Sequence, residues 1–150
     1  MSAGKARRAA VLTLLVAVGC TGGGDHAESP ASPPECEARL AVPPGFRVVE
    51  SFRDPYPDHV GVRLGFRDDE GREIHYLVGI PGEFGEGLPF EGPVPVASGG
   101  PARLLGRGRT WVLAWNETGP CAAHAVLGHG FGRAEFERVL EDAGVIPAPG

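Results

Sequence analysis

Long hydrophobic runs are missing from this 150-residue sequence, whose longest one is the predominantly apolar stretch from Ala9 to Val18. As a helix, these ten residues would extend about 15 Å, half the thickness of a bilayer's hydrocarbon core. The stretch is therefore too short to span a membrane. Lysine is nearly absent too, with Lys5 as the one example. Because no lysine follows Gly82, Gly85 and Gly87, these glycines indicate phosphate binding only weakly.

The sequence also lacks the usual catalytic and metal-binding motifs. Serine is scarce after the expected linker ends at residue 35, where only Ser51 and Ser98 occur, and neither lies in the Gly-x-Ser-x-Gly motif of serine hydrolases. There is no His-Glu-x-x-His or Cys-x-x-Cys motif. His124 and His129 are five residues apart, which places them on opposite faces of a strand. We therefore expect no catalytic residues, no metal site and no cofactor.

The N-terminus has the three zones of an export signal. Lys5, Arg7 and Arg8 form a positive region, the apolar stretch follows, and Gly19 and Cys20 come next. This order predicts a signal peptide over residues 1–19. The alternative, a buried core helix, fits poorly with the basic start and with the glycines at 22–24.

The sequence Ala17-Val18-Gly19-Cys20 resembles the lipobox of bacterial lipoproteins. In that family the thiol of the cysteine receives diacylglycerol before cleavage, although leucine is usual at the position of Ala17. The resemblance implies that Cys20 is lipidated and that the protein is anchored on the extracytoplasmic side of the cell membrane or at the outer surface. The alternative is cleavage by an ordinary signal peptidase, which would release a free secreted protein.

The residues after Cys20 predict a tether followed by an acidic domain. Residues 21–34 contain almost no apolar side chains and cannot offset the entropy of ordering, so we expect a flexible linker over 20–35. A globular domain is expected over 36–146 and a disordered tail over 147–150. Without residues 1–19 the chain keeps 11 basic and 19 acidic residues, a net charge of −8. This charge argues against nucleic acid as a partner and against adhesion to anionic lipid.

Cys36 and Cys121 remain once Cys20 is assigned to the anchor. In an oxidising compartment, two cysteines predict a disulfide. This bond would join the start of the domain to a late strand. The alternative is a catalytic thiol, which no neighbouring motif supports.

The domain's clearest local pattern is a β-hairpin. Apolar residues alternate with other residues from Val60 to Phe66 and again from Ile74 to Ile80, which is typical of half-buried strands. Gly71 suits the turn between them. The predicted register pairs Phe66 with Ile74, continues through Leu64–Tyr76, Val62–Val78 and Val60–Ile80, and sets Arg67 opposite Glu73.

The rest of the domain predicts further strands and one closing helix. Strands are expected within 41–52, at 102–105, 110–115 and 121–128, with an edge strand near 94–96 that Pro93 and Pro95 confine to an edge. Residues 79–101 form a long Gly/Pro-rich loop. From Arg133 to Ala143, apolar residues recur at helical spacing. The predicted fold class is α+β, an antiparallel sheet with one C-terminal helix packed on a face. The expected core comprises Val60, Val62, Leu64, Phe66, Ile74, Tyr76, Val78, Trp111, Leu113, Trp115, Phe136, Val139 and Leu140.

The order of these motifs resembles a small extracytoplasmic module of bacterial lipoproteins and of the outer ends of anti-sigma-like membrane proteins. The matching features are Val42-Pro43-Pro44-Gly45-Phe46, the hairpin turn Asp69-Glu70-Gly71, Gly106, Trp115 with Asn116-Glu117-Thr118-Gly119, and the helix from Phe136 to Leu140. The chain departs from the module in its cysteine pair and in lacking a membrane-spanning helix. The resemblance implies a β-rich fold with a binding or sensing role, and it transfers no catalytic residues.

One face of the predicted hairpin is a candidate binding face, consisting of Arg63, Gly65 and His75. Glycines weaken a strand unless something approaches them closely. Either the 79–101 loop folds over this face, or the face contacts an extracytoplasmic protein partner. Both interpretations predict a non-catalytic, membrane-anchored lipoprotein that binds a partner or ligand. The alternative function is a small extracytoplasmic enzyme with its site under the 79–101 loop.

Overall fold

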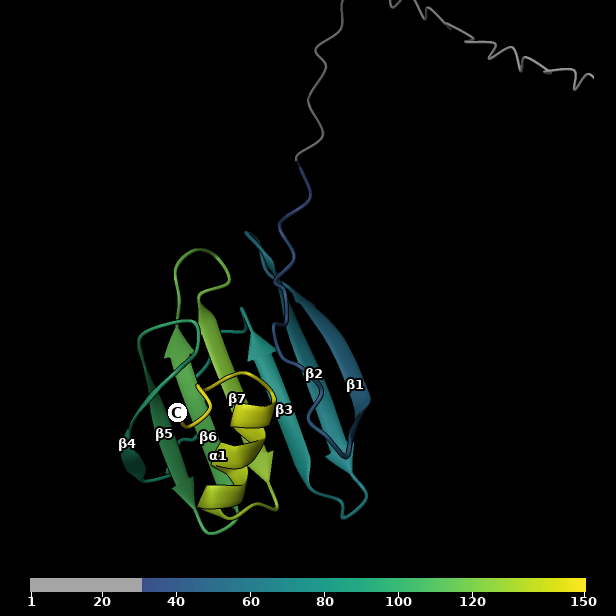
Figure 1. Cartoon of the computed structure of the whole chain (residues 1–150). Coiled ribbons are helices and arrows are strands. Elements are labelled where there is room, and N and C mark those ends of the chain that lie inside the picture. The colour runs from purple at the N-terminus through teal and green to yellow at the C-terminus, as the bar shows by residue number, and fades with distance from the viewer. Residues whose placement is uncertain (1–30) are drawn as a thin grey trace, which may run out of the picture. The chain divides into compact units, whose positions relative to one another are not determined.

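The computed structural model describes residues 31–150, which form seven antiparallel strands followed by one helix (Figure 1). The expected signal peptide and most of the expected linker, Cys20 included, lie outside the described residues. The elements are β1 (Phe46–Pro55), β2 (Val60–Asp68), β3 (Glu73–Val78), β4 (Phe90–Pro95), β5 (Pro101–Arg107), β6 (Thr110–Asn116), β7 (Ala123–His129) and α1 (Arg133–Asp142). This architecture confirms the α+β class. No helix within residues 31–150 has the length and apolar character needed to cross a membrane.

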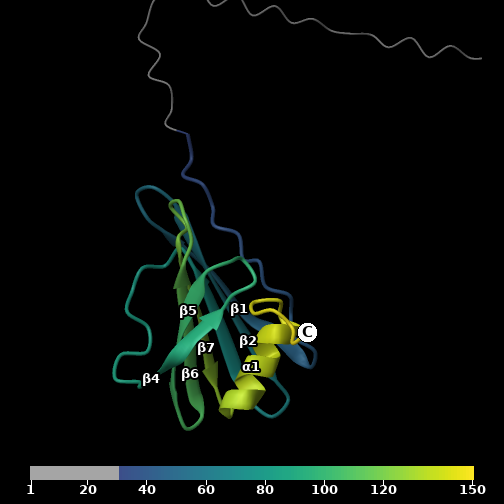
Figure 2. The same cartoon turned by 60° about the vertical axis from the view of Figure 1, so that its left-hand side comes forward.

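The strands form a single sheet in the order β1-β2-β3-β7-β6-β5-β4. It consists of two meanders, β1–β3 and β4–β7, which pair through β3 and β7. The chain must therefore travel from the middle of the sheet to its far edge between β3 and β4. We call residues 79–89 the crossing segment. It runs over the face of the sheet opposite α1 (Figure 2), so helix and crossing segment cover different faces.

The predicted hairpin register is confirmed for most of its length. Phe66 pairs with Ile74, Leu64 with Tyr76, and Val62 with Val78. Gly71 has φ +78° in the turn, where glycine adopts a left-handed conformation without steric cost. The expected pair Val60–Ile80 does not form, because β3 ends at Val78 and Gly79, with φ +66°, turns the chain away.

The core lies between the sheet and α1. Fully buried side chains come from β2, β3, β5, β6, β7 and the helix with its approach, namely Phe66, Ile74, Val78, Leu104, Leu113, Val126, Phe131, Phe136 and Leu140. Most of the expected core is buried, but Val60, Val62, Leu64 and Val139 are only half-buried. The reason is position: Val60, Val62 and Leu64 lie on β2, next to the edge strand. The partly buried Ala38 and Leu40 also pack against the core.

The ends of α1 match the sequence signals. Gly132 is the N-cap, and its N–H donates to Glu135 Oε2 at 2.8 Å. The rings of Phe131 and Phe136 lie 6.3 Å apart, as expected for a hydrophobic contact that fixes the helix entry. Gly144, with φ +74°, ends the helix in the left-handed conformation.

The folded part begins slightly earlier than expected, and its first strand begins later. The N–H of Val60 donates to the carbonyl of Pro34 at 2.9 Å, and that of Cys36 donates to Val60 at 2.8 Å. Residues 34 and 35 therefore belong to the domain rather than to a free linker. The chain reaches β1 only at Phe46, because the N–H of Ala41 bonds to the carbonyl of Ala143 at the end of the helix.

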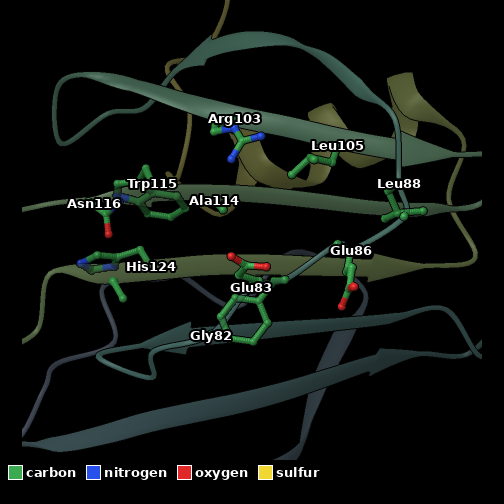
Figure 3. A pocket seen from close by; sticks show the side chains of 14 residues that line it. Gly82, Glu83, Glu86, Leu88, Arg103, Leu105, Ala114, Trp115, Asn116 and His124 are labelled. Carbon is green, nitrogen blue, oxygen red and sulfur yellow. The ribbon is translucent and has the colours of Figure 1, made fainter.

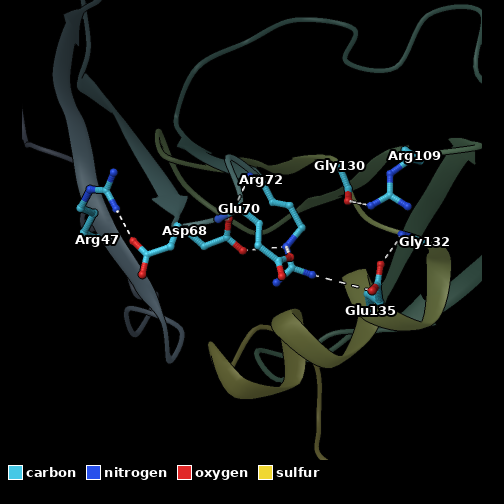
Figure 4. Close-up of polar contacts among 9 residues, drawn as sticks. Arg47, Asp68, Glu70, Arg72, Arg109, Gly130, Gly132 and Glu135 are labelled. Atoms are coloured by element: carbon cyan, nitrogen blue, oxygen red, sulfur yellow. Dashed lines mark hydrogen bonds and ion pairs between the residues drawn. The ribbon is translucent and has the colours of Figure 1, made fainter.

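A polar network joins the β2–β3 turn to α1 (Figure 4). Asp68 is buried, and its carboxylate accepts hydrogen bonds from the backbone N–H groups of Glu70 and Arg72 and from Arg72 Nε at 2.6 Å. The Arg72 guanidinium also lies 3.7 Å from Glu135 and 5.1 Å from the centre of the Phe131 ring. One arginine thus links the hairpin turn to the first turn of the helix.

Candidate functional site

The predicted disulfide between Cys36 and Cys121 is present, with Cα atoms 5.6 Å apart. It joins the start of the domain to the residue two positions before β7. Gly79 lies against it, because a Cβ at that position would be 2.4 Å from Cys36 Sγ. Only glycine fits there, so the bond and the turn after β3 depend on each other.

His59 is buried beside the same turn and faces two acceptors. Its Nε2 lies 2.6 Å from the carbonyl oxygen of Gly79, and its Nδ1 lies 2.7 Å from a carboxylate oxygen of Asp58. A neutral imidazole can donate only one hydrogen bond, so this geometry favours the imidazolium. The Gly79 carbonyl and then the Asp58 carboxylate accordingly raise the pKa of His59 above its usual value.

The structure brings Arg63, Gly65 and His75 together on the sheet face opposite α1. Arg63 Nη2 donates to Glu50 Oε1 at 2.6 Å, and its guanidinium lies 5.5 Å from the centre of the exposed Phe52 ring. His75 Nε2 lies 3.3 Å from Glu73 Oε2. The charged groups of this candidate binding face thus pair with carboxylates on β1 and β3.

Neighbours within the domain also account for the glycines on this face. A Cβ on Gly65 would lie 3.0 Å from Glu50 Cβ and 3.3 Å from His75 Nδ1. A Cβ on Gly61 would lie 2.8 Å from Ile80. Contact of the face with a protein partner stays a prediction, but the glycines no longer require one.

The crossing segment lies over the other half of this sheet face rather than over the hairpin. A Cβ on Gly85 would be 3.4 Å from Val112 on β6 and 3.6 Å from Leu105 on β5. The expectation that the loop folds over the hairpin face therefore holds only for the start of the segment at Gly79 and Ile80. The reason is topological, because the chain must reach β4 at the far edge.

A hollow of about 500 Å³ lies between the crossing segment and strands β5, β6 and β7 (Figure 3). Its cover is the stretch from Gly82 to Leu88. Its sheet side is formed by Arg103, Leu105, Ala114, Trp115, Asn116, Ala123 and His124. The hollow lies where the enzyme alternative placed a site, although the sequence did not reveal its sheet side. The length of the Gly/Pro-rich connection was the available signal for this hollow. It points to a crossing of the sheet only once β4 is known to lie at the far edge.

The walls of this hollow combine apolar and charged side chains, and their exposed surface is more polar than apolar. Leu88, Leu105 and Ala114 provide apolar surface, while Glu83, Glu86 and Arg103 bring charge. Among the residues in the described part of the chain that line the hollow, none carries a thiol or hydroxyl side chain. The hollow therefore has no nucleophile of these kinds.

A second hollow of about 260 Å³ adjoins a buried polar cluster on the face toward α1. The Tyr76 hydroxyl lies 3.2 Å from Nδ1 of His124, and the Glu117 carboxylate lies 3.3 Å from Nε2 of the same ring. Burial lowers the pKa of His124, outweighing the effect of Glu117, and it raises the pKa of Tyr76 to about 12. A neutral His124 thus donates to Glu117 and accepts from Tyr76.

This cluster was missed in the sequence because Tyr76 and His124 are 48 positions apart. Trp115 Nε1 donates to the second oxygen of Glu117 at 3.3 Å, so both of its oxygens are engaged. Both ring nitrogens of His124 have partners as well, and the cluster offers no free proton acceptor to a ligand. We assign it a structural role.

Within residues 31–150, no three histidine, cysteine or acidic side chains gather in a way that could hold a metal ion. No protein-family model, curated protein or solved structure matches the chain. The resemblance to extracytoplasmic lipoprotein modules therefore stays a prediction. Together, fold and site define an α+β domain with a hollow beneath a crossing segment.

Proposed function

We propose that this chain is a membrane-anchored lipoprotein that binds a small ligand outside the cytoplasm, in the hollow beneath the crossing segment. The observation that carries the proposal is the hollow itself. Its volume of about 500 Å³ is within the usual range of small-molecule sites, which are mostly apolar with a few placed polar groups. The lining described above also combines apolar side chains with charged ones, although its exposed surface is more polar than is usual for such sites.

Two features favour binding over catalysis at this site. The lining side chains include no thiol or hydroxyl, and the ring nitrogens of His124 are occupied by Tyr76 and Glu117. The enzyme alternative would have to use Glu83 or Glu86, the carboxylates that line the hollow, and both of them are exposed to solvent. A protein partner on the Arg63–Gly65–His75 face has less support, because the charges there already pair within the domain.

The compartment and anchor rest on separate observations. A disulfide between Cys36 and Cys121 is typical of an oxidising compartment. The Gly19-Cys20 pair after an apolar stretch is the sequence basis for the lipid anchor. Binding would then take place on the extracytoplasmic side, within reach of the membrane.

Benzyl alcohol, a neutral aromatic probe, tests the hollow directly. When it is titrated into the ¹⁵N-labelled full chain in mild detergent, amide shifts should concentrate on residues that line the hollow. Ala114→Trp, which fills the space, should abolish them, while Thr118→Trp in the exposed β6–β7 turn should not. Binding unchanged by Ala114→Trp, or no localised shifts in the native chain, would overturn the proposal.

The anchor is tested by Cys20→Ala. We expect the native protein to partition with membranes and to carry a diacylglycerol-modified N-terminal cysteine by mass spectrometry. The variant should be released, or should accumulate as an unprocessed precursor. A mature N-terminus with an unmodified Cys20 would contradict the lipid anchor.

A further inference from the structure

Three charged side chains that line the hollow, Arg103, Glu83 and Glu86, have no ion-pair partner within the described residues. Arg47, Arg63 and Arg67 each pair with a carboxylate on a neighbouring strand or turn. Among residues 31–150, by contrast, neither Arg103 nor Glu83 nor Glu86 has an opposite charge within 4.0 Å. Charges of both signs therefore surround one hollow without neutralising each other.

The two signs occupy different walls (Figure 3). Arg103 projects from β5, and its guanidinium lies 5.7 Å from the centre of the Phe90 ring on neighbouring β4. Glu83 and Glu86 come from the crossing segment that covers the hollow. A ligand between them would meet a cation on the sheet side and carboxylates on the cover.

The apolar surface between these walls limits what the ligand can be. Leu88, Leu105 and Ala114 offer no hydrogen-bonding side chain. A ligand that carried only a positive charge would leave Arg103 facing it, and one that carried only a negative charge would face two carboxylates. A molecule with one charge of each sign and an apolar body matches all of the surfaces at once.

We propose that the hollow binds a small zwitterion, an apolar amino acid or short peptide, with its carboxylate toward Arg103 and its ammonium toward Glu83 and Glu86. This inference rests on the proposed function, because it assigns a ligand class to the same site. Amino acids and short peptides share the required chemistry, and they differ in the spacing between their two charges.

Three probes with the same apolar body separate the contributions of the two charges. L-Phenylalanine carries both charges, phenethylamine lacks the carboxylate, and 3-phenylpropanoate lacks the ammonium. Each is titrated into the ¹⁵N-labelled full chain, and the dipeptide Gly-Phe is added to distinguish a peptide from a free amino acid. We expect a zwitterion, phenylalanine or Gly-Phe, to bind at least about fivefold more tightly than either singly charged probe.

Matched variants then assign each charge to a wall. Arg103→Gln should weaken binding of phenylalanine and 3-phenylpropanoate about fivefold and leave phenethylamine unaffected or bound more tightly. The double variant Glu83→Gln/Glu86→Gln should weaken binding of phenethylamine. It should leave 3-phenylpropanoate unaffected or bound more tightly. Arg107→Gln, on the same strand but outside the hollow, and Glu37→Gln are the controls.

The outcomes separate this inference from the proposed function. Equal binding of all probes, or equal effects of the hollow and control variants, would overturn the zwitterion while leaving the hollow a binding site. Binding of benzyl alcohol without binding of any zwitterion would likewise overturn the zwitterion and leave the hollow a binding site. If neither benzyl alcohol nor the charged probes bind, the proposed function fails as well.

Discussion

Two buried histidines have opposite protonation preferences, although each is hydrogen-bonded through both ring nitrogens. His59 faces a carbonyl and a carboxylate, so both nitrogens must donate. His124 faces a hydroxyl and a carboxylate, so a neutral ring satisfies both partners. Partner chemistry thus favours the charged ring of His59, whereas burial favours the neutral ring of His124.

The two histidines therefore make the free energy of unfolding depend on pH in opposite directions. The raised pKa of His59 gives stability that is present below 6.5 and lost as pH rises through the folded-state value. The lowered pKa of His124 gives stability that is present above 6.5 and lost as pH falls toward the folded-state value. Urea unfolding from about pH 5 to 9 measures both effects. His59→Gln should remove the loss of stability at high pH, and His124→Gln should remove the loss of stability at low pH. Changes of the same sign in both variants would contradict this assignment.

Two adjacent aspartates in the β2–β3 turn should differ sharply in their effect on stability. Burial raises the pKa of Asp68, but the hydrogen bonds and charge of Arg72 outweigh it and hold the pKa below its usual value. Asp68→Ala leaves Arg72 without its main partner and should cost about 3 kcal/mol. Asp69 is 98 % exposed, so Asp69→Ala should stay within about 0.5 kcal/mol. Similar losses in the two variants, measured by urea unfolding, would show that the turn network contributes little.

At the scale of elements, glycines allow aromatic rings to lie flat on the sheet. A Cβ on Gly106 would be 1.9 Å from Cε3 of Trp111, and one on Gly128 would be 2.6 Å from the Phe136 ring. Trp111 is further held by its Nε1–H, which donates to the Phe131 carbonyl at 3.1 Å. Trp111 thus lies over Gly106 of β5 and links it to the residues that lead into α1.

Replacing Gly106 should displace that tryptophan. Gly106→Ala should cost about 3 kcal/mol, because the ring cannot move without losing its hydrogen bond to Phe131. In a Trp111→Leu background the same change should cost much less, which identifies the ring as the cause. Calorimetric or urea unfolding measures both. A loss below about 0.5 kcal/mol in the native background would contradict the close packing.

Local sequence patterns predicted the elements better than their arrangement. The β2–β3 hairpin followed from alternation and from Gly71, and α1 followed from its apolar stripe and flanking glycines. β1 was expected too early, because the bond of Ala41 to Ala143 links the two ends of the domain and leaves no local signature. The hollow and the Tyr76–His124–Glu117 cluster depend on β3 pairing with β7, a long-range choice that no local pattern encodes.

For the whole molecule, the disulfide between Cys36 and Cys121 closes a loop of 85 residues. The chain-entropy model gives about 4.6 kcal/mol as the upper figure for a loop of this length. The double variant Cys36→Ala/Cys121→Ala should therefore lose up to this amount in urea unfolding, with its sheet signature retained by circular dichroism. Unchanged stability would mean that removing the disulfide does not raise the conformational entropy of the unfolded chain enough to matter.

The position of this disulfide also decides how the domain bears mechanical load. Tension arriving along the chain from its N-terminal side reaches Cys36 before it reaches β1. Part of that load passes through the bond to Cys121 and so to β7, at the centre of the sheet between β3 and β6. The edge strand β1 is thereby shielded from being peeled away one hydrogen bond at a time, and the sheet is loaded where it is held on both sides.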